Sequence, residues 1–94
     1  MAEVLNEDEI GSRLRRLAWE REGDEIVREW RFDGFTEAVA FVNRVADVAE
    51  DANHHPDIFL HGWNKVKLSL TNHSAGGLTE MDFTMAARFD DLDG

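Results

Sequence analysis

Hydrophobic and polar residues alternate along the 94-residue chain with two different periods, one typical of helices and one typical of strands. The clearest helical period runs through the middle of the chain. The apolar residues that fall on one half of its helical wheel are Ala38, Phe41, Val42, Val45, Ala46, Val48 and Ala49. Charged side chains fill the other side. We therefore predict a long amphipathic helix that is capped by Thr36 and ends near residue 52.

Two segments with a period of two predict β-hairpins on either side of this helix. Residues 18–22 and 25–32 form the first hairpin, and Gly23-Asp24 supplies its turn. Residues 57–71 form the second, with a turn near His61-Gly62. Because the connections are short, the paired strands are expected to be antiparallel.

Capping signals predict one further helix near each end of the chain. Asn6 precedes residues 7–17 and has Glu9 three positions on, which is the spacing of a capping box. Thr79 and Asp82 repeat this spacing before the last helix. Asp82 also falls within the apolar side of that helix, so it either caps the helix or faces a pocket, and both roles are compatible.

The predicted elements follow one another in the order αββαββα. This order favours an α+β fold, a single domain over residues 1–94, in which three helices pack on one face of a four-stranded antiparallel sheet. Ninety-four residues leave no room for a second hydrophobic core.

Charge and composition exclude several classes of function. Twenty acidic residues against ten basic ones give a net charge of −10, which disfavours nucleic acid as a partner. The chain has no cysteine, so disulfides and thiolate metal sites are excluded. No apolar run is long enough to cross a membrane, and the acidic N-terminus does not resemble a signal peptide. We expect a cytoplasmic protein without a membrane partner.

The candidate chemistry lies in the segment "EDANHHP", residues 50–56, which contains the only proline of the chain. Proline forces His55 into an extended conformation, so the side chains of His54 and His55 are expected to point to opposite sides. Three interpretations remain open: ordinary surface histidines, two ligands of a zinc site, or acid–base catalysis by imidazoles that titrate near neutral pH. Glu50 lies about one helical turn before His54 and could orient an imidazole.

Taken in order, Glu50, His54-His55-Pro56, Trp63, His73 and Asp82 resemble the signature of the pterin-4a-carbinolamine dehydratases. The segments "FTEAVAFVNRVADVAEDANHHP" and "NKVKLSLTNHSAGGLT" are similar to that family's long helix and to its last strand and substrate loop. The similarity extends over most of the chain, from about residue 17 to residue 92.

This resemblance implies a 4a-hydroxytetrahydrobiopterin dehydratase, a hydro-lyase that needs no cofactor and no metal. It would convert the 4a-hydroxytetrahydropterin released by aromatic amino-acid hydroxylases into quinonoid dihydropterin and so support tetrahydrobiopterin recycling. The implied catalytic residues are His54 and His73 as acid and base, with His55 lining the pterin pocket. The implied substrate-binding residues are Glu50, Pro56, Asn72, Ser74, Ala75, Asp82 and Trp19.

Two further expectations follow from the same resemblance. Some relatives are non-catalytic binding or assembly factors on the same scaffold, which is the alternative function for this chain. The family also implies a homodimer or a homotetramer. We expect the strand that carries Val66, Leu68 and Leu70 to lie at a sheet edge, where it would be covered by a second subunit.

Overall fold

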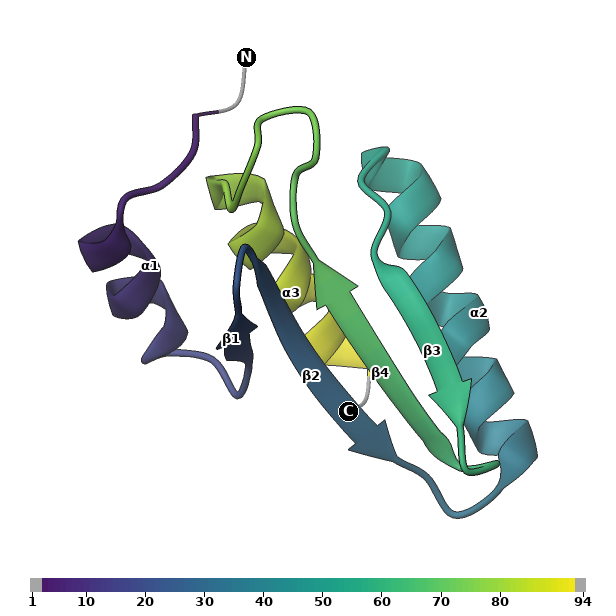
Figure 1. The fold of residues 1–94 in the computed structure, drawn as a ribbon. Coiled ribbons are helices and arrows are strands. Elements are labelled where there is room, and N and C mark those ends of the chain that lie inside the picture. The colour runs from purple at the N-terminus through teal and green to yellow at the C-terminus, as the bar shows by residue number, and fades with distance from the viewer. Residues whose placement is uncertain (1–2, 93–94) are drawn as a thin grey trace.

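The computed structural model describes residues 3–92, so the two residues at each end of the predicted 1–94 domain lie outside the described part. The chain folds in the predicted order αββαββα (Figure 1). The helices and strands have the following bounds: α1 Glu7–Leu14, β1 Glu20–Glu22, β2 Glu25–Arg31, α2 Phe35–Ala52, β3 Asp57–His61, β4 Lys65–Leu70 and α3 Glu80–Leu92.

The four strands form one antiparallel sheet in the order β1-β2-β4-β3. β4 pairs with β2 on one side and with β3 on the other, so Leu68 lies between Arg28 and Ile58. The expectation that β4 lies at an edge is therefore wrong. β4 is a central strand, which explains why Val66 and Leu70 are fully buried, and β3 is the edge strand on this side of the sheet.

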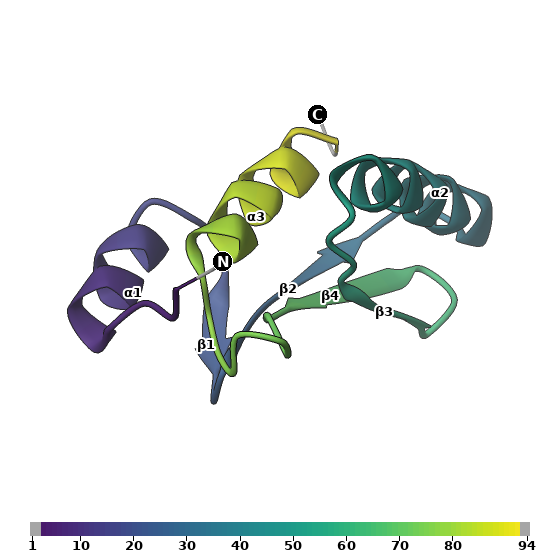
Figure 2. The same ribbon diagram turned by 90° about the horizontal axis from the view of Figure 1, so that it is seen from above.

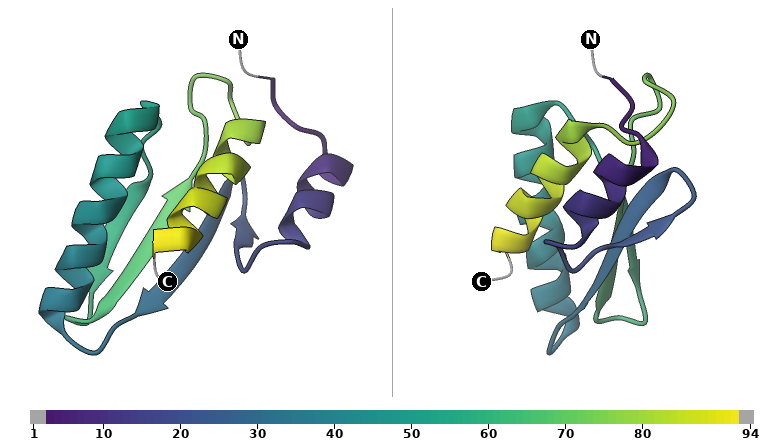
Figure 3. Two further views of the ribbon diagram at one scale, coloured as in Figure 1. Left: turned by 180° about the vertical axis from the view of Figure 1, so that it is seen from behind. Right: turned by 90° about the vertical axis from the view of Figure 1, so that its left-hand side faces the viewer.

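All three helices lie on the same side of the sheet, as Figure 2 shows, with α3 between α1 and α2 and with α2 over β3 and β4. The two views in Figure 3 show the same arrangement, in which none of the described helices covers the opposite face of the sheet. The core lies between the layers because apolar side chains of the strands and of the helices are buried there. Large side chains in this core include Ile26, Trp30, Leu68, Leu70, Phe41, Met85 and Phe89.

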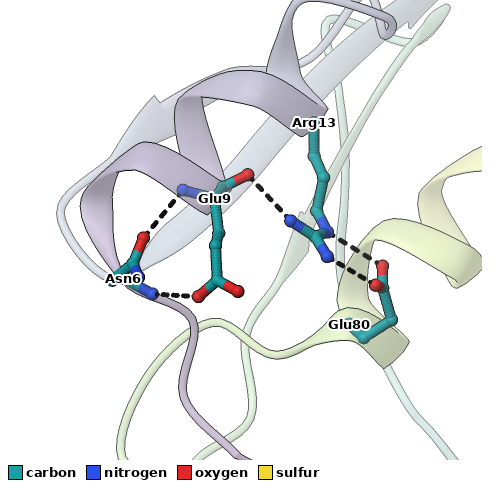
Figure 4. A network of polar contacts seen from close by, with 4 residues as sticks. All are labelled: Asn6, Glu9, Arg13 and Glu80. Carbon is teal, nitrogen blue, oxygen red and sulfur yellow. Dashed lines mark hydrogen bonds and ion pairs between the residues drawn. The ribbon is translucent and has the colours of Figure 1, made fainter.

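The first helix begins as its capping box predicts. The Asn6 side chain accepts a hydrogen bond from the Glu9 amide at 2.9 Å, and the Glu9 carboxylate accepts one from the Asn6 amide at 2.8 Å (Figure 4). The helix ends at Leu14, earlier than expected, because the amides of Arg16 and Leu17 bond to carbonyls three residues back and tighten the chain. Arg15 and Arg16, which fall within the predicted helix of residues 7–17, thus lie beyond it.

An ion pair connects α1 to the start of α3. Arg13 donates two hydrogen bonds to the carboxylate of Glu80, one from Nε at 3.0 Å and one from Nη2 at 2.7 Å (Figure 4). The hydrogen bonds from Arg13 lower the pKa of Glu80. The amide of Leu5 also donates to the carbonyl of Leu78 at 2.8 Å. The N-terminal segment is therefore attached to the residues that precede α3.

The long helix begins one residue before its predicted cap. Its N-cap is Gly34, which makes no side-chain hydrogen bond, so the prediction that Thr36 caps the helix is wrong. The reason is tertiary: the amide and carbonyl of Phe32 both bond to Asn64, at 2.8 and 3.0 Å, and this contact determines where the chain turns into α2. No helix within residues 3–92 is long and apolar enough to span a membrane.

Candidate active site

The long helix α2 ends in a Schellman motif directly before the histidine pair. Asn53 adopts the left-handed conformation, with φ 51° and ψ 42°. Its amide donates to the Glu50 carbonyl at 3.2 Å, and the amide of His54 donates to the Ala49 carbonyl at 3.1 Å. Asparagine tolerates this conformation better than most residues. The backbone position of His54 is therefore determined by the helix end itself.

Asp82 connects this helix end to the start of α3. Its Oδ2 atom accepts a hydrogen bond from the amide of Thr79 at 2.8 Å, which is the predicted capping contact. Its Oδ1 atom lies 2.6 Å from Nε2 of His54. The carboxylate is fully buried, and only 13% of the His54 side chain is exposed. Both roles considered for Asp82 are thus present at once, one on each oxygen.

This contact determines which nitrogen of His54 carries a proton. A carboxylate accepts hydrogen bonds, so Nε2 of His54 donates to it, and Nδ1 is the nitrogen left for another partner. A second group that fixes the tautomer and the ring plane of a histidine is a common feature of sites in which imidazole transfers protons.

The neighbouring histidine makes the same kind of pair in a different environment. Nε2 of His55 contacts the carboxylate of Glu50, which lies in the last turns of α2. Both side chains are exposed, at 54% for His55 and 75% for Glu50. Pro56 follows His55 and keeps it out of the helical conformation. As expected, the two adjacent imidazoles have different partners.

The loop between β4 and α3 presents His73. Asn72 closes this loop, because its carbonyl accepts hydrogen bonds from the amides of Ala75, Gly76 and Gly77 at 3.0–3.2 Å. Its side chain accepts a further bond from the Ala75 amide at 3.0 Å. Gly76 has a φ of 86°, which other residues rarely adopt. The closed loop leaves His73 exposed.

His73 also contributes to a shallow hollow of about 290 Å³ beside the turn between β1 and β2. The other residues that line the hollow are Asp24, Glu25, Thr71, Gly76 and Gly77. No hydrogen bond among residues 3–92 joins the loop to either histidine of the pair.

The end of α2, this loop and the start of α3 lie at one end of the molecule. Figure 1 shows them together at the top, and the left view of Figure 3 places them together again. The structure therefore brings the histidine pair, its two carboxylates and the His73 loop to a common end of the sheet. Within the described part of the chain, no three or more histidine, cysteine or acidic side chains are grouped so that they could hold a metal ion.

Trp19 is not part of this group. It is buried, its ring packs edge-on against Trp30, and its indole donates to Asp90 at 2.9 Å. Asp90 lies eight residues beyond Asp82 on α3, about 12 Å along the helix axis. The structure places Trp19 in the core near the far end of α3. A core role explains its burial without any contact to the histidines.

One further histidine has a carboxylate partner away from this end. His61, the last residue of β3, lies 2.5 Å from the carboxylate of Glu29 on β2 and stacks on Phe59. His61 is not among the site residues that the sequence predicts.

Two features of the site were missed from the sequence. The first is the left-handed Asn53, which the residue type itself could have indicated, because asparagine often ends helices this way. The second is the hydroxyl of Thr79, which donates to Asp82 at 3.2 Å.

Comparison with known proteins gives one consistent family. The family model described as pterin 4 alpha carbinolamine dehydratase matches residues 3–92. A protein of Roseiflexus castenholzii named "Putative pterin-4-alpha-carbinolamine dehydratase" is 50% identical over 98% of this chain and 99% of its own length. Among solved structures, a transcriptional coactivator/pterin dehydratase from Brucella melitensis superposes with a TM-score of 0.90 and 34% identity, covering 97% of this chain and 99% of that one.

A more distant structure shares the fold alone. It is a pterin dehydratase-like protein described as a RuBisCO assembly factor in the alpha-carboxysome. Its TM-score is 0.66 at 24% identity, over 83% of this chain and 89% of that one.

Proposed function

The chain belongs to the pterin 4 alpha carbinolamine dehydratase family, and from this premise we propose that it dehydrates a 4a-hydroxytetrahydropterin to quinonoid dihydropterin. The observation that carries the proposal is the contact between His54 and the buried carboxylate of Asp82, at 2.6 Å, at the end of the molecule that also presents His73. This reaction would make the protein a 4a-hydroxytetrahydrobiopterin dehydratase that acts by histidine acid–base catalysis.

The reaction needs one proton donor and one proton acceptor. The bond between C4a and the hydroxyl oxygen breaks, and the hydroxyl leaves as water after it takes a proton from the acid. The base removes the proton on N5, and the electron pair of that N–H bond forms the C4a–N5 double bond. No electrons enter or leave the system, so the chemistry requires no redox partner. Two imidazoles on either side of the pterin suffice for both proton transfers.

His54 and His73 are the proposed acid–base pair. His54 is suited to this task because Asp82 holds Nε2 and leaves Nδ1 for the substrate. His73 is suited to it because its loop is closed by Asn72 and presents the imidazole at the surface. Positioned groups of this kind contribute about 10²–10⁴-fold each to a rate.

The substrate-binding residues in this proposal come from the same end of the molecule. His55 and Glu50 would line the ring from the helix end, and Pro56 would contact it from the start of β3. The loop would supply the remaining contacts through Asn72, Ser74 and Ala75. Trp19 is left out, because its burial and its bond to Asp90 place it in the core.

A homodimer or homotetramer is part of the same proposal, in the cytoplasm and in functional connection with an aromatic amino-acid hydroxylase. The support for a subunit interface is the free edge of β3. Among the strands of residues 3–92, this strand pairs only with β4, and it exposes Ile58 and Phe59, at 38% and 59%. Light scattering at micromolar concentration is expected to give at least twice the monomer mass of 10.7 kDa. A monomer would refute this part.

Stopped-flow dehydration of a synthetic 4a-carbinolamine tests the function directly. The protein is expected to accelerate dehydration, and His73→Ala is expected to lower kcat by about 10²–10⁴-fold in folded protein. His61→Ala is the matched control, because it removes a histidine with a carboxylate partner outside the site, and it should leave kcat unchanged. EDTA should have no effect.

Three outcomes would contradict the proposal. If EDTA abolished dehydration and zinc restored it, a metal site would replace acid–base catalysis. If His61→Ala slowed the reaction as much as His73→Ala, the site would be misplaced. If the folded wild-type protein did not accelerate dehydration at all, a non-catalytic binding or assembly role would become the better proposal.

A further inference from the structure

Thr79, which directly precedes α3, uses its hydroxyl in an unusual way. In an ordinary capping box, the hydroxyl before the helix accepts a hydrogen bond from the amide three residues on. Here that amide, of Asp82, bonds to the Thr79 carbonyl at 3.1 Å. The Thr79 hydroxyl instead donates to Oδ2 of Asp82 at 3.2 Å. Its proton is therefore directed at the carboxylate that contacts His54.

The carboxylate of Asp82 contacts three donor groups, two on one oxygen and one on the other. Oδ2 accepts from the amide of Thr79 at 2.8 Å and from its hydroxyl, while Oδ1 faces Nε2 of His54 at 2.6 Å. The side-chain torsion of an aspartate that turns its carboxylate is broad and soft. Two donors on the same oxygen restrict this rotation, and the other oxygen is then held toward His54.

Burial makes this orientation important. Thr79 is 1% exposed and Asp82 is fully buried. A buried carboxylate that turned away from its donors would leave polar groups without partners, which is costly in the interior. The hydroxyl of Thr79 thus supports a chain of contacts from the start of α3 to the imidazole of His54.

We propose that Thr79 is a positioning residue for His54. It acts through Asp82 and does not touch the substrate: its hydroxyl fixes the plane of the carboxylate, and the carboxylate fixes the tautomer and the ring plane of His54. The kinetic part of this inference rests on the proposed dehydration, whereas the structural part does not.

The kinetic test compares Thr79→Val with Thr79→Ser. Valine keeps the shape of threonine and its backbone amide but removes the hydroxyl, whereas serine keeps the hydroxyl. Thr79→Val is expected to lower kcat about three- to tenfold, the effect of one net hydrogen bond, and to leave KM within about twofold. Thr79→Ser is expected to retain wild-type kcat. Thr84→Val, at an exposed position of α3, is the matched control and should change neither constant.

A second measurement does not depend on catalysis. In protein labelled with ¹⁵N-histidine, the proton on Nε2 of His54 is expected to exchange slowly with water in the wild type and in Thr79→Ser. It should exchange at least about tenfold faster in Thr79→Val, because the carboxylate that holds it is less restricted. If Thr79→Val does not fold, the same comparison is made between Thr79→Ala and Thr79→Ser.

The two measurements separate failure of this inference from failure of the proposed function. If the His54 ring proton is protected equally in Thr79→Val and in the wild type, the positioning role is refuted, whatever the activity. If the wild-type protein does not dehydrate the pterin but the exchange difference is seen, the positioning role stands and the function is wrong. If Thr79→Ser loses as much kcat as Thr79→Val, the methyl group matters rather than the hydroxyl, and the inference is also overturned.

Discussion

His54 and His55 are adjacent in the chain and each contacts a carboxylate, but the two pairs differ in almost every physical respect. The His54 pair is buried, with exposed fractions of 13% for the imidazole and 0% for Asp82. The His55 pair is open to water, at 54% and 75%. The partner of His54 comes from another helix, α3, whereas Glu50, the partner of His55, lies in the helix just before it.

This difference shows that burial, and not residue type, decides what a histidine–carboxylate pair can do. Exposed pairs contribute about 0–1 kcal/mol, because water screens the charges and the side chains lose freedom. Removal of one partner from a buried pair leaves a polar group without compensation and costs several times more. We therefore expect the buried pair to be held more rigidly than the exposed pair.

The largest expected effect is on turnover, because substitution of each histidine should change a different kinetic constant. His54→Ala is expected to lower kcat by about 10²–10⁴-fold in folded protein, because it removes an acid–base group. His55→Ala should mainly raise KM, because it removes binding that is common to the ground state and the transition state. Steady-state kinetics on both variants measures the split. Equal losses of kcat would mean that burial does not distinguish their roles.

The next largest difference is expected between the two carboxylates, in how much each contributes to the free energy of unfolding. Asp82→Ala is expected to lower the free energy of unfolding by about 2–4 kcal/mol, because the start of α3 loses its cap and buried His54 loses its partner. Turnover should fall as well. Glu50→Ala should cost about 0–1 kcal/mol. Urea denaturation checks both, with Asp51→Ala as a control at an exposed acid on α2 whose nearest cation, Arg88, is 3.6 Å away.

Equal losses of unfolding free energy in Glu50→Ala and Asp82→Ala would contradict the expected difference in stability. Full activity in the folded Asp82→Ala protein would contradict the expected loss of turnover, since Asp82 would then only cap the helix.

A smaller effect is expected at Asn53, whose left-handed backbone conformation ends α2 directly before the two histidines. Asn53→Ala is expected to cost about 1–2 kcal/mol, because alanine disfavours the left-handed conformation. Asn53→Gly should cost less, since glycine adopts this conformation freely. Thermal unfolding of the two variants measures the difference. A glycine variant less stable than the alanine variant would rule out the left-handed helix end as the cause.

The smallest effect concerns the exposed ion pair between Arg13 and Glu80, next to the buried pair at the start of α3. Arg13 lowers the pKa of Glu80 from its ordinary value of 4.5. A carboxyl whose pKa is lowered on folding stabilises the protein above that ordinary value, and this contribution is lost as the pH falls through the lowered pKa. Glu80→Gln should therefore be slightly less stable than the wild type near neutral pH.

This difference should shrink on acidification below about pH 4.5 and in high salt, since the pair is exposed. Unfolding of both proteins by urea from pH 3 to pH 7 measures it. A difference that grew toward low pH would show that the pair does not stabilise the folded state.

Much of the fold could be predicted because its signals are local. The capping box of Asn6 and Glu9 joins residues three apart, and the structure shows both of its hydrogen bonds. The alternation in β4 likewise reflects which side chains point to the core. The order αββαββα and the antiparallel hairpins follow from signals of this range.

The candidate site was only partly visible in the same way. The family could be identified from the order along the chain of Glu50, the histidine pair, His73 and Asp82, and the comparisons confirm it. The contact between Asp82 and His54 joins residues 28 positions apart, and no local pattern contains it. The catalytic and binding roles of these residues stay predictions.

The sequence by itself determined the order of the elements, the start of α1 after Asn6 and of β3 after Pro56, and the set of chemical groups near the histidine pair. Only the tertiary structure decided that β4 is a central strand, that Trp19 packs in the core and that Asp82 serves both α3 and His54. The physical reason is the distance along the chain over which each kind of interaction acts. Caps, turns and periodicity act between residues a few positions apart, whereas sheet order and burial depend on how distant segments pack around one core. That packing, rather than the residue types, makes His54 different from His55.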